Sequence, residues 1–316
     1  MTILITGAGG FIGRHLIEAL LHSGQGPLAG LDQNPPAKFP VKFFCADLRD
    51  DRAAAEAIGR IQPERIYHLA GYSSNARSFS EPATVIRDNL GMAVNLLGAV
   101  AKLDKPCRTL LLSTAQVYGD ARGRLREEDR PAPLSPYALS KLGMEEVARF
   151  YHRTCGLDLV VTRAANQFGP GQSDEYVVSS FARQLLELKM GLRRAELEVG
   201  NLKAKRDFID VRDAVSGYLL LMEKAEAGQT YNLAQGRNLA IEDLLFQMIE
   251  FCGLERSHIK IRVSAGRLRP EPKAEAVISV ARIRKLGFRP RIKLETSLRD
   301  LLDYWGRVCA KVVSRK

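Results

Sequence analysis

Short apolar runs alternate with longer amphipathic segments through the first half of the chain. Runs rich in Ile, Leu, Val and Phe, typical of buried strands, occupy residues 3–5, 28–31, 41–45, 63–69, 109–114 and 159–163. Apolar residues at helical spacing lie between them, over residues 11–21, 50–60, 84–103 and 136–155. This regular alternation predicts an α/β fold built on a doubly wound parallel sheet.

The alternation becomes less regular after Gly169. Helical patterns cover residues 176–190, 212–224, 241–252 and 294 onward, and short strand patterns cover residues 197–201, 205–211, 230–233 and 259–263. We therefore expect a first domain over residues 1–166 and a smaller C-terminal α/β lobe for the substrate over residues 167–316. The chain is expected to cross back to the first domain around residues 207–235.

The first strand pattern leads into a glycine-rich turn, Thr6-Gly-Ala-Gly-Gly-Phe-Ile-Gly13, and then into a helical pattern. Here Gly7 permits a tight turn, Gly10 lets the backbone approach a pyrophosphate, and Gly13 lets the helix pack close to the strand. The helix N-terminus adds free N–H groups and partial positive charge. The motif predicts a Rossmann-type domain that binds a dinucleotide; a glycine turn without a ligand is the alternative.

Asp32 ends the second strand pattern. An acid at this place accepts hydrogen bonds from the adenosine ribose and repels a 2′-phosphate. The sequence therefore favours NAD(H), with NADP(H) as the alternative cofactor. Asp32 could instead cap a turn, and Asp47-Leu48 after the third strand could contact adenine or cap the next helix.

The segment Ser135-Pro-Tyr-Ala-Leu-Ser-Lys141 carries the main candidate for chemistry. Tyr137 and Lys141 are four residues apart and share one helix face. Ser135 and Pro136 suit the cap and first residue of that helix. A lysine ammonium beside a phenol lowers its pKa from roughly 10, so the pair predicts a proton donor and acceptor for alcohol–ketone interconversion. The alternative is an ordinary helix with a surface lysine.

Composition narrows the class of protein. The 316 residues are 46% hydrophobic and 26% charged, which is typical of a globular protein, and no apolar run is long enough to cross a bilayer. The net charge of +11 is spread along the chain, so we expect no nucleic-acid partner and no membrane partner. The five scattered cysteines lack metal-type spacing, and the chain opens on a strand rather than a signal peptide. These features predict a cytoplasmic protein without a metal site.

Taken in order, these residues resemble the extended short-chain dehydrogenase/reductase family, which acts on nucleotide sugars. The similarity covers nearly the whole chain and includes residues 6–13, Asp32, Asp47-Leu48, His68-Leu69-Ala70, Asn89, Ser113-Thr114, Val117-Tyr118-Gly119, Glu128-Asp129, Tyr137-x-x-x-Lys141 and Arg163-x-x-Asn166-x-x-Gly169-Pro170. The resemblance implies that Tyr137 is the acid/base, that Lys141 orients the nicotinamide ribose and lowers the tyrosine pKa, and that Thr114 positions the substrate oxygen. It further implies cofactor contacts from Gly7, Gly10, Phe11, Ile12, Gly13, Asp32, Asp47, Leu48, Leu69, Ala70, Gly71 and Asn89, besides Tyr137 and Lys141.

Within the family, residues 166–172, 200–213 and 268–270 resemble those of GDP-6-deoxy-4-keto-mannose reductases and GDP-mannose 4,6-dehydratases. This likeness favours a GDP-sugar over a UDP-sugar. Gln167, where these enzymes usually have His, and residues 271–273 depart from their pattern and leave the sugar open. The implied substrate contacts are Ser74, Thr114, Asn166, Val177, Arg183, Arg206 and Arg269.

The three arginines among the implied substrate contacts differ in how well the sequence supports a role in phosphate binding. Arg206 and Arg269 suit a diphosphate because guanidinium groups grip phosphate in bidentate fashion. A surface ion pair is the alternative for each, since Asp207 follows Arg206 directly. For Arg183, ordinary solvation is an equal alternative.

The residues after Thr114 separate the possible reactions. Dehydratases of this family carry a carboxylate within two residues of that threonine, whereas this chain has Ala115 and Gln116. Reduction of a C4 ketone is therefore favoured, a nucleotide-sugar 4-epimerase is the alternative, and a non-catalytic sugar-nucleotide-binding protein is the second alternative.

The resemblance also implies a homodimer built from the Asn89 and Tyr137 helices of two subunits. Apolar side chains at helical spacing could form its interface, or they could belong to the core of one chain; they are Val94, Leu97, Val100, Met144, Val147 and Phe150.

Overall fold

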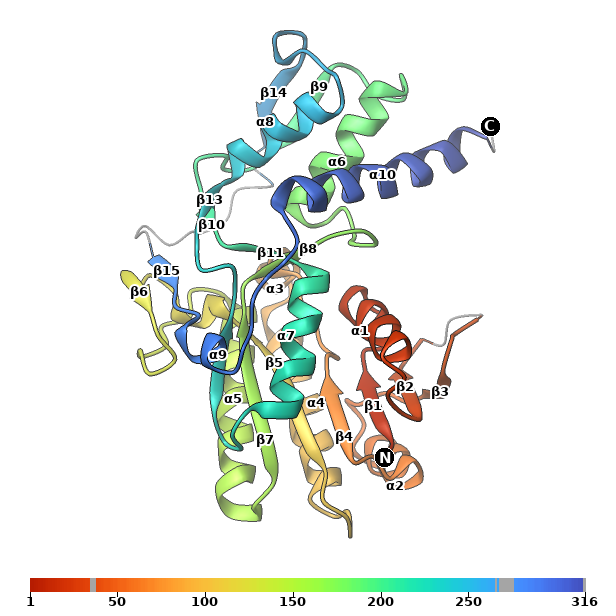
Figure 1. The fold of residues 1–316 in the computed structure, drawn as a ribbon, viewed down its shortest axis with the longest axis vertical. Coiled ribbons are helices and arrows are strands. Elements are labelled where there is room, and N and C mark those ends of the chain that lie inside the picture. The colour runs from red at the N-terminus through yellow and green to blue at the C-terminus, as the bar shows by residue number, and fades with distance from the viewer. Residues whose placement is uncertain (35–37, 265, 267–275, 315–316) are drawn as a thin grey trace.

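The structure is a computed structural model that describes residues 1–34, 38–264, 266 and 276–314 (Figure 1). Its centre is a seven-stranded sheet in the order β12-β7-β5-β4-β1-β2-β3, in which every neighbouring pair is parallel. The strands are β1 (Ile3–Thr6), β2 (Leu28–Asp32), β3 (Lys42–Cys45), β4 (Arg65–His68), β5 (Arg108–Thr114), β7 (Asp158–Ala164) and β12 (Thr230–Leu233). The predicted Rossmann-type doubly wound sheet is confirmed.

Helices cover both faces of this sheet (Figure 1). Successive side chains of a strand point to opposite faces, so Ile3 and Ile5 join one core and Leu4 joins the other. The first core contains side chains of α1 (Phe11–His22), α7 (Val211–Lys224) and α9 (Ala281–Lys285). The opposite face is covered by α2 (Asp51–Ile61), α4 (Pro82–Val100) and α5 (Pro136–Cys155).

A further apolar core, separate from the two on the faces of the sheet, lies in the upper part of Figure 1. Its helices are α6 (Val177–Lys189), α8 (Ile241–Phe251) and α10 (Leu294–Val313), and Trp305 of α10 donates a 2.8 Å hydrogen bond to the Ser179 hydroxyl of α6. The described residues also form four two-stranded sheets: β10 (Lys205–Arg206) with β13 (Leu239–Ala240), β11 (Phe208–Asp210) with β8 (Asn166–Phe168), β14 (Lys260–Val263) with β9 (Glu196–Val199), and β15 (Ala276–Ile278) with β6 (Gly123–Leu125). Two short 3₁₀ helices are η1 (Ala115–Tyr118) and η2 (Arg256–His258).

The predicted elements and the observed ones differ in two places. The sequence patterns include no helix over residues 73–78, but Ser74 caps a short helix, α3 (Asn75–Ser80), by accepting a hydrogen bond from the Arg77 N–H. The strand patterns at residues 197–201 and 205–211 become β9, β10 and β11, and none of these three pairs with another. They pair with distant strands, because backbone partners of such short strands are set by tertiary contacts rather than by local pattern.

No helix within the described residues is long and apolar enough to cross a membrane. The same residues contain no group of three or more His, Cys, Asp or Glu side chains that could hold a metal ion.

Candidate active site

A cavity of about 960 Å³ opens where the strands of the central sheet end. Its lining includes the glycine turn after β1, the carboxyl ends of β2, β4, β5 and β7, the starts of α3 and α5, and the segments around α6 and β10. In an open α/β sheet, ligands bind outside the carboxyl ends of the strands. The volume lies at the upper end of the range for ligand sites, about 300–1,000 Å³. It is large enough for two ligands side by side.

The glycine turn is packed as the sequence predicts. Gly7 has a left-handed φ of +66°, and a Cβ placed there would lie 2.8 Å from the Ala70 nitrogen. A Cβ on Gly13 would lie 2.5 Å from the Gly7 carbonyl oxygen. Gly10 caps α1 without any side-chain hydrogen bond, so the helix N-terminus faces the cavity with its N–H groups uncapped by side chains.

Asp32 stands at the end of β2 beside this turn. One carboxylate oxygen accepts a 3.2 Å hydrogen bond from the Gly9 N–H, and the other accepts a 2.8 Å bond from the Gln33 N–H. Asp32 also lines the cavity, so the carboxylate that holds the turn is accessible to a ligand, and its contact with a ribose stays a prediction. Asp47 does not cap α2, because Asp50 does. Instead it pairs with the Arg49 guanidinium at 2.6 Å.

Arg49 is a residue that sequence analysis missed. Its guanidinium also donates a 3.0 Å hydrogen bond to the Gln33 side chain and lies 3.4 Å from Asp88. The hydrogen bond from Arg49 lowers the pKa of Asp47. Asp32, Gln33, Asp47 and Arg49 therefore form one polar wall at the end of the cavity nearest β2 and β3.

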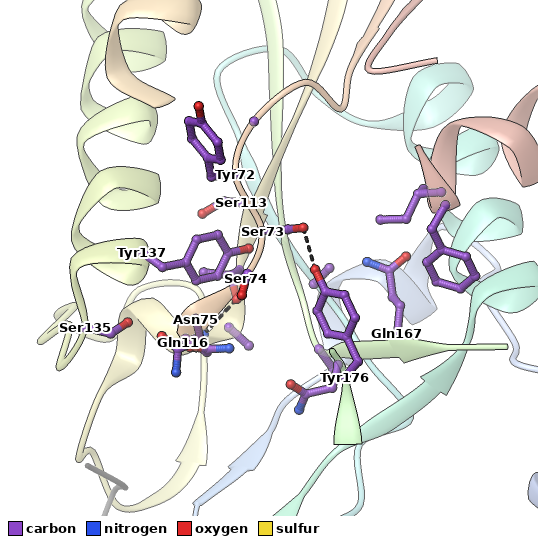
Figure 2. A pocket seen from close by; sticks show the side chains of 18 of the residues that line it. Tyr72, Ser73, Ser74, Asn75, Ser113, Gln116, Ser135, Tyr137, Gln167 and Tyr176 are labelled. Carbon is purple, nitrogen blue, oxygen red and sulfur yellow. Dashed lines mark hydrogen bonds between the residues drawn. The ribbon is translucent and has the colours of Figure 1, made fainter. Parts of the chain in front are cut away.

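Tyr137 enters the cavity from the first turn of α5 (Figure 2). The helix start is the predicted one: Pro136 is its first residue, and the Ser135 hydroxyl accepts a 3.1 Å hydrogen bond from the Ala138 N–H. Thr114 lines the same cavity at the end of β5, where its hydroxyl accepts a hydrogen bond from the Gln116 N–H and so fixes the following turn. A phenol and a hydroxyl thus converge at the end of the central strands.

The expected lowering of the Tyr137 pKa is not found. Burial raises the pKa of the Tyr137 phenol and the neighbouring Tyr176 raises it further, while interaction with the Thr114 hydroxyl opposes both. The Lys141 ammonium is directed elsewhere, because it donates a 2.8 Å hydrogen bond to the Leu112 carbonyl. Tyr137 therefore keeps its proton at neutral pH, and it can release that proton only to a group that gains negative charge.

Lys141 itself is deeply buried and does not line the cavity directly. Burial lowers its pKa to about 8, and the nearby Glu145 carboxylate opposes that shift. Glu145 is also buried and forms an ion pair with Arg163 of β7 at 2.8 Å. It accepts a further hydrogen bond from the Ser113 hydroxyl of β5 at 2.5 Å. This network ties the catalytic helix to two central strands.

Asn89 does not line the cavity, but its hydrogen bonds hold segments that do. Its side-chain oxygen accepts a 2.7 Å hydrogen bond from the Tyr72 N–H, and its NH₂ group donates to the Tyr72 carbonyl at 3.1 Å and the Ser140 hydroxyl at 2.9 Å. Because Ser140 in turn donates to the Tyr137 carbonyl, Asn89 couples the loop after β4 to the first turn of α5.

The structure brings most of the predicted site residues to the cavity wall. They are Gly7, Gly10, Phe11, Ile12, Gly13, Asp32, Asp47, Leu48, Leu69, Ala70, Gly71, Ser74, Thr114, Tyr137, Asn166, Val177 and Arg206. Arg183 does not reach the wall; its guanidinium is held by the carboxylates of Asp174 and Glu187. Arg269 lies outside the described residues.

The sequence left a surface ion pair with Asp207 as the alternative role for Arg206, but the Asp207 carboxylate has other partners. The Asp207 carboxylate is buried and accepts hydrogen bonds from the backbone N–H groups of Gln235, Gly236 and Arg237 at 2.9, 2.7 and 3.0 Å. Arg206 lies at the cavity wall and donates a 2.8 Å bond to the Lys205 carbonyl. A basic segment, residues 203–206, therefore borders the end of the cavity formed by β10.

Amide side chains also belong to the cavity lining. They include those of Asn75, Gln116, Asn166, Gln167 and Gln172. Together with the close-packed Gly7 turn and the start of α1, which no side chain caps, they fit a nicotinamide dinucleotide and a second ligand rich in hydroxyl groups.

Comparison with known proteins agrees with this geometry. Residues 3–234 match the NAD dependent epimerase/dehydratase family. A GDP-6-deoxy-D-mannose reductase of Pseudomonas aeruginosa is 34% identical over 310 residues, which cover 96% of each chain. A dTDP-glucose 4,6-dehydratase of Streptomyces antibioticus is 28% identical and covers 96% of this chain and 92% of its own.

Among solved structures, RMD from Pseudomonas aeruginosa complexed with NADPH has a TM-score of 0.82 at 32% identity, covering 97% of this chain and 100% of its own. The UDP-glucose 4-epimerase of Thermus thermophilus in complex with NAD has a TM-score of 0.85 at 28% identity, covering 96% and 99%. The family resemblance seen in the sequence is thus confirmed. The chain belongs to the NAD dependent epimerase/dehydratase family.

Proposed function

We propose that this protein reduces the C4 ketone of a nucleotide-activated 6-deoxy-4-keto-hexose, with GDP-4-keto-6-deoxy-mannose as the favoured substrate. The observation that carries the proposal is a protonated phenol, Tyr137, that meets the Thr114 hydroxyl at the carboxyl end of the central sheet. The relative with 34% identity, a GDP-6-deoxy-D-mannose reductase, supports the choice of substrate.

Each residue then has a defined task. When bound, the reduced nicotinamide supplies the hydride that the ketone carbon accepts. Thr114 holds the ketone oxygen by a hydrogen bond, and Tyr137 donates its proton to that oxygen as negative charge develops there. Lys141, one helical turn beyond Tyr137 on α5, is positively charged at neutral pH, since its pKa is about 8. Its ammonium donates to the Leu112 carbonyl, so its task is to stabilise the Tyr137 phenolate by charge after proton transfer rather than by a hydrogen bond.

Elimination of water is disfavoured by the turn after Thr114. Removing water across C5–C6 needs an acid and a base beyond the tyrosine, yet the wall here is formed by Ala115 and Gln116. Neither side chain ionises. The similarity to a dTDP-glucose 4,6-dehydratase therefore does not support dehydration by this chain.

A 4-epimerase is the second candidate, because the similarity to the NAD-bound UDP-glucose 4-epimerase is equally extensive. An epimerase uses the same tyrosine in both directions and returns the hydride to the opposite face of the sugar. It therefore consumes no reduced nicotinamide.

One experiment separates the candidates. Purified protein is mixed with GDP-4-keto-6-deoxy-mannose and NADH or NADPH, and the absorbance of the reduced nicotinamide is followed. Stoichiometric consumption supports the reductase. No consumption, with conversion of UDP- or GDP-hexoses to their C4 epimers, supports the epimerase. Tight sugar-nucleotide binding without turnover of either kind supports a non-catalytic binding protein.

We also propose NAD(H) as the favoured cofactor, because the Asp32 carboxylate at the cavity wall repels a 2′-phosphate. NADP(H) stays as an alternative, since Arg49 adds a positive charge to the same wall and the reductase RMD was solved with NADPH.

A cytoplasmic homodimer joined through α4 and α5 is a further proposal. Leu97, Val100 and Met144 are buried in the core of one chain and are therefore not available to a partner. Val94 and Phe150 remain exposed, at 39% and 59%, and supply an apolar face for a second copy. Sedimentation equilibrium of wild type and Phe150→Glu tests this, since a dimer on this face dissociates in the variant.

A further inference from the structure

Tyr176 crosses the cavity from one side to the other. It immediately precedes α6, and its hydroxyl lies 2.7 Å from the hydroxyl of Ser73, in the loop between β4 and α3. Figure 2 shows this hydrogen bond as the link between the two walls, with Tyr137 close by on the helix side. The two residues are 103 positions apart in the chain, so no local pattern joins them.

The Tyr176 phenol belongs to the reacting end of the cavity. It lies close enough to Tyr137 to raise the pKa of that phenol. Burial raises the pKa of Tyr176 itself, and the Ser73 hydroxyl opposes that shift. Tyr176 is therefore a neutral hydroxyl, able to donate one hydrogen bond and accept another. Ser73 uses only one of these two possibilities.

The surroundings indicate the ligand. Ser74 and Asn75, at the start of α3, and Gln116, after β5, line the same cavity as Tyr137 and Tyr176 (Figure 2). A region with several hydroxyl and amide groups fits a molecule that carries several hydroxyl groups. A hexose is such a molecule, whereas a phosphate offers acceptors only.

We propose that Tyr176 is a specificity-determining residue, whose hydroxyl, oriented by Ser73, hydrogen-bonds a hydroxyl of the substrate's hexose beside the carbon that reacts. This inference rests on the proposed function for the class of ligand, a nucleotide sugar. It adds a group that recognises the sugar rather than the nucleotide.

Binding measurements test the inference without turnover. The protein saturated with NAD⁺ is titrated calorimetrically with GDP-mannose and with GDP, and in parallel with UDP-glucose and UDP. The ratio of the sugar-nucleotide affinity to the nucleotide affinity reports recognition of the sugar. Tyr176→Phe removes a single oxygen and should reduce this ratio roughly 3- to 10-fold, the value of one neutral hydrogen bond. Affinity for GDP or UDP should stay unchanged.

Two further variants separate recognition from structure. Ser73→Ala should reduce the ratio less than Tyr176→Phe, and the double variant should equal Tyr176→Phe alone, because both act through one hydroxyl. Tyr304→Phe on α10 and Ser80→Ala on α3 are the matched controls; neither residue lines the cavity, and both variants should leave the ratio unchanged. A change in the free energy of unfolding without a change in the ratio would assign Tyr176 a structural role only.

The outcomes are distinct from those of the proposed function. A chain that reduces no keto sugar but loses sugar recognition in Tyr176→Phe contradicts the proposed reaction and supports the inference. If the wild-type protein is an active reductase and Tyr176→Phe leaves the ratio of sugar-nucleotide to nucleotide affinity unchanged, the inference is overturned and the proposed reaction stands. A wild-type protein that binds neither sugar nucleotide more tightly than its nucleotide overturns the inference as well.

Discussion

Replacement of Gly7 by Ala tests the packing of the glycine turn, on which the cofactor site depends. At φ +66° an alanine adopts the left-handed conformation, which costs about 1–2 kcal/mol. The new Cβ would also lie 2.8 Å from the Ala70 nitrogen and 2.9 Å from the Leu69 carbonyl carbon. These atoms cannot withdraw freely, because the N–H groups of Ala70 and Leu69 donate hydrogen bonds to the hydroxyl and carbonyl of Thr6. Overpacking adds about 1–3 kcal/mol.

Two glycines elsewhere in the chain separate these contributions. Gly24 has nearly the same φ, +64°, but nothing within 4 Å of a Cβ, so Gly24→Ala should cost only the conformational term of about 1–2 kcal/mol. Gly59, inside α2, also has open space, and Gly59→Ala should stabilise the protein by roughly 1 kcal/mol.

The assay is urea unfolding of the three variants, combined with titration of NADH or NADPH. We expect Gly7→Ala to lose about 2–5 kcal/mol of the free energy of unfolding and to bind the cofactor more weakly. The other two variants should keep wild-type cofactor affinity. A Gly7→Ala protein no less stable than Gly24→Ala would refute the close approach of the turn to β4.

Three further predictions concern the site. Burial lowers the Lys141 pKa to about 8, so the ammonium loses its charge as pH rises through that value. We therefore expect kcat/KM to fall above pH 8. An active Lys141→Arg variant should not show this fall, because a guanidinium stays charged. A profile flat to pH 10 would contradict this. Asp32→Ala should shift the ratio of kcat/KM values toward NADPH, since a carboxylate that repels the 2′-phosphate is lost; an unchanged ratio would remove Asp32 from the cofactor site. Asn89→Ala removes three hydrogen bonds, two with the Tyr72 backbone and one with the Ser140 hydroxyl, and should lower the free energy of unfolding in urea by about 3 kcal/mol. A loss below about 0.5 kcal/mol would show that these hydrogen bonds contribute little.

Local sequence signals were enough to predict where α5 and the glycine turn lie. Ser135 and Pro136 define the start of α5 within one residue, because a cap and a first-turn proline act on their immediate neighbours. The apolar runs of β5 and β7 were equally readable, since strands buried on both faces leave an uninterrupted hydrophobic signature. These features fix the positions of Thr114 and Tyr137.

Contacts between segments that are distant in the chain could not be predicted from the sequence. The hydrogen bond between Ser73 and Tyr176 joins two loops whose local patterns say nothing about each other. The direction of the Lys141 ammonium toward the Leu112 carbonyl depends on how α5 packs on β5, so helical spacing alone gave the wrong pKa direction for Tyr137. Likewise, β9 and β14 are four-residue strands that find each other only in the folded chain.

The central claim is that Tyr137 donates the proton when the sugar ketone is reduced. Its most direct test is single-turnover oxidation of NADPH or NADH by GDP-4-keto-6-deoxy-mannose in wild type and in Tyr137→Phe, with cofactor affinity measured in both. We predict that the variant binds the cofactor as wild type does and reacts about 10²- to 10⁴-fold more slowly. A Tyr137→Phe protein that oxidises the cofactor at the wild-type rate would contradict the account.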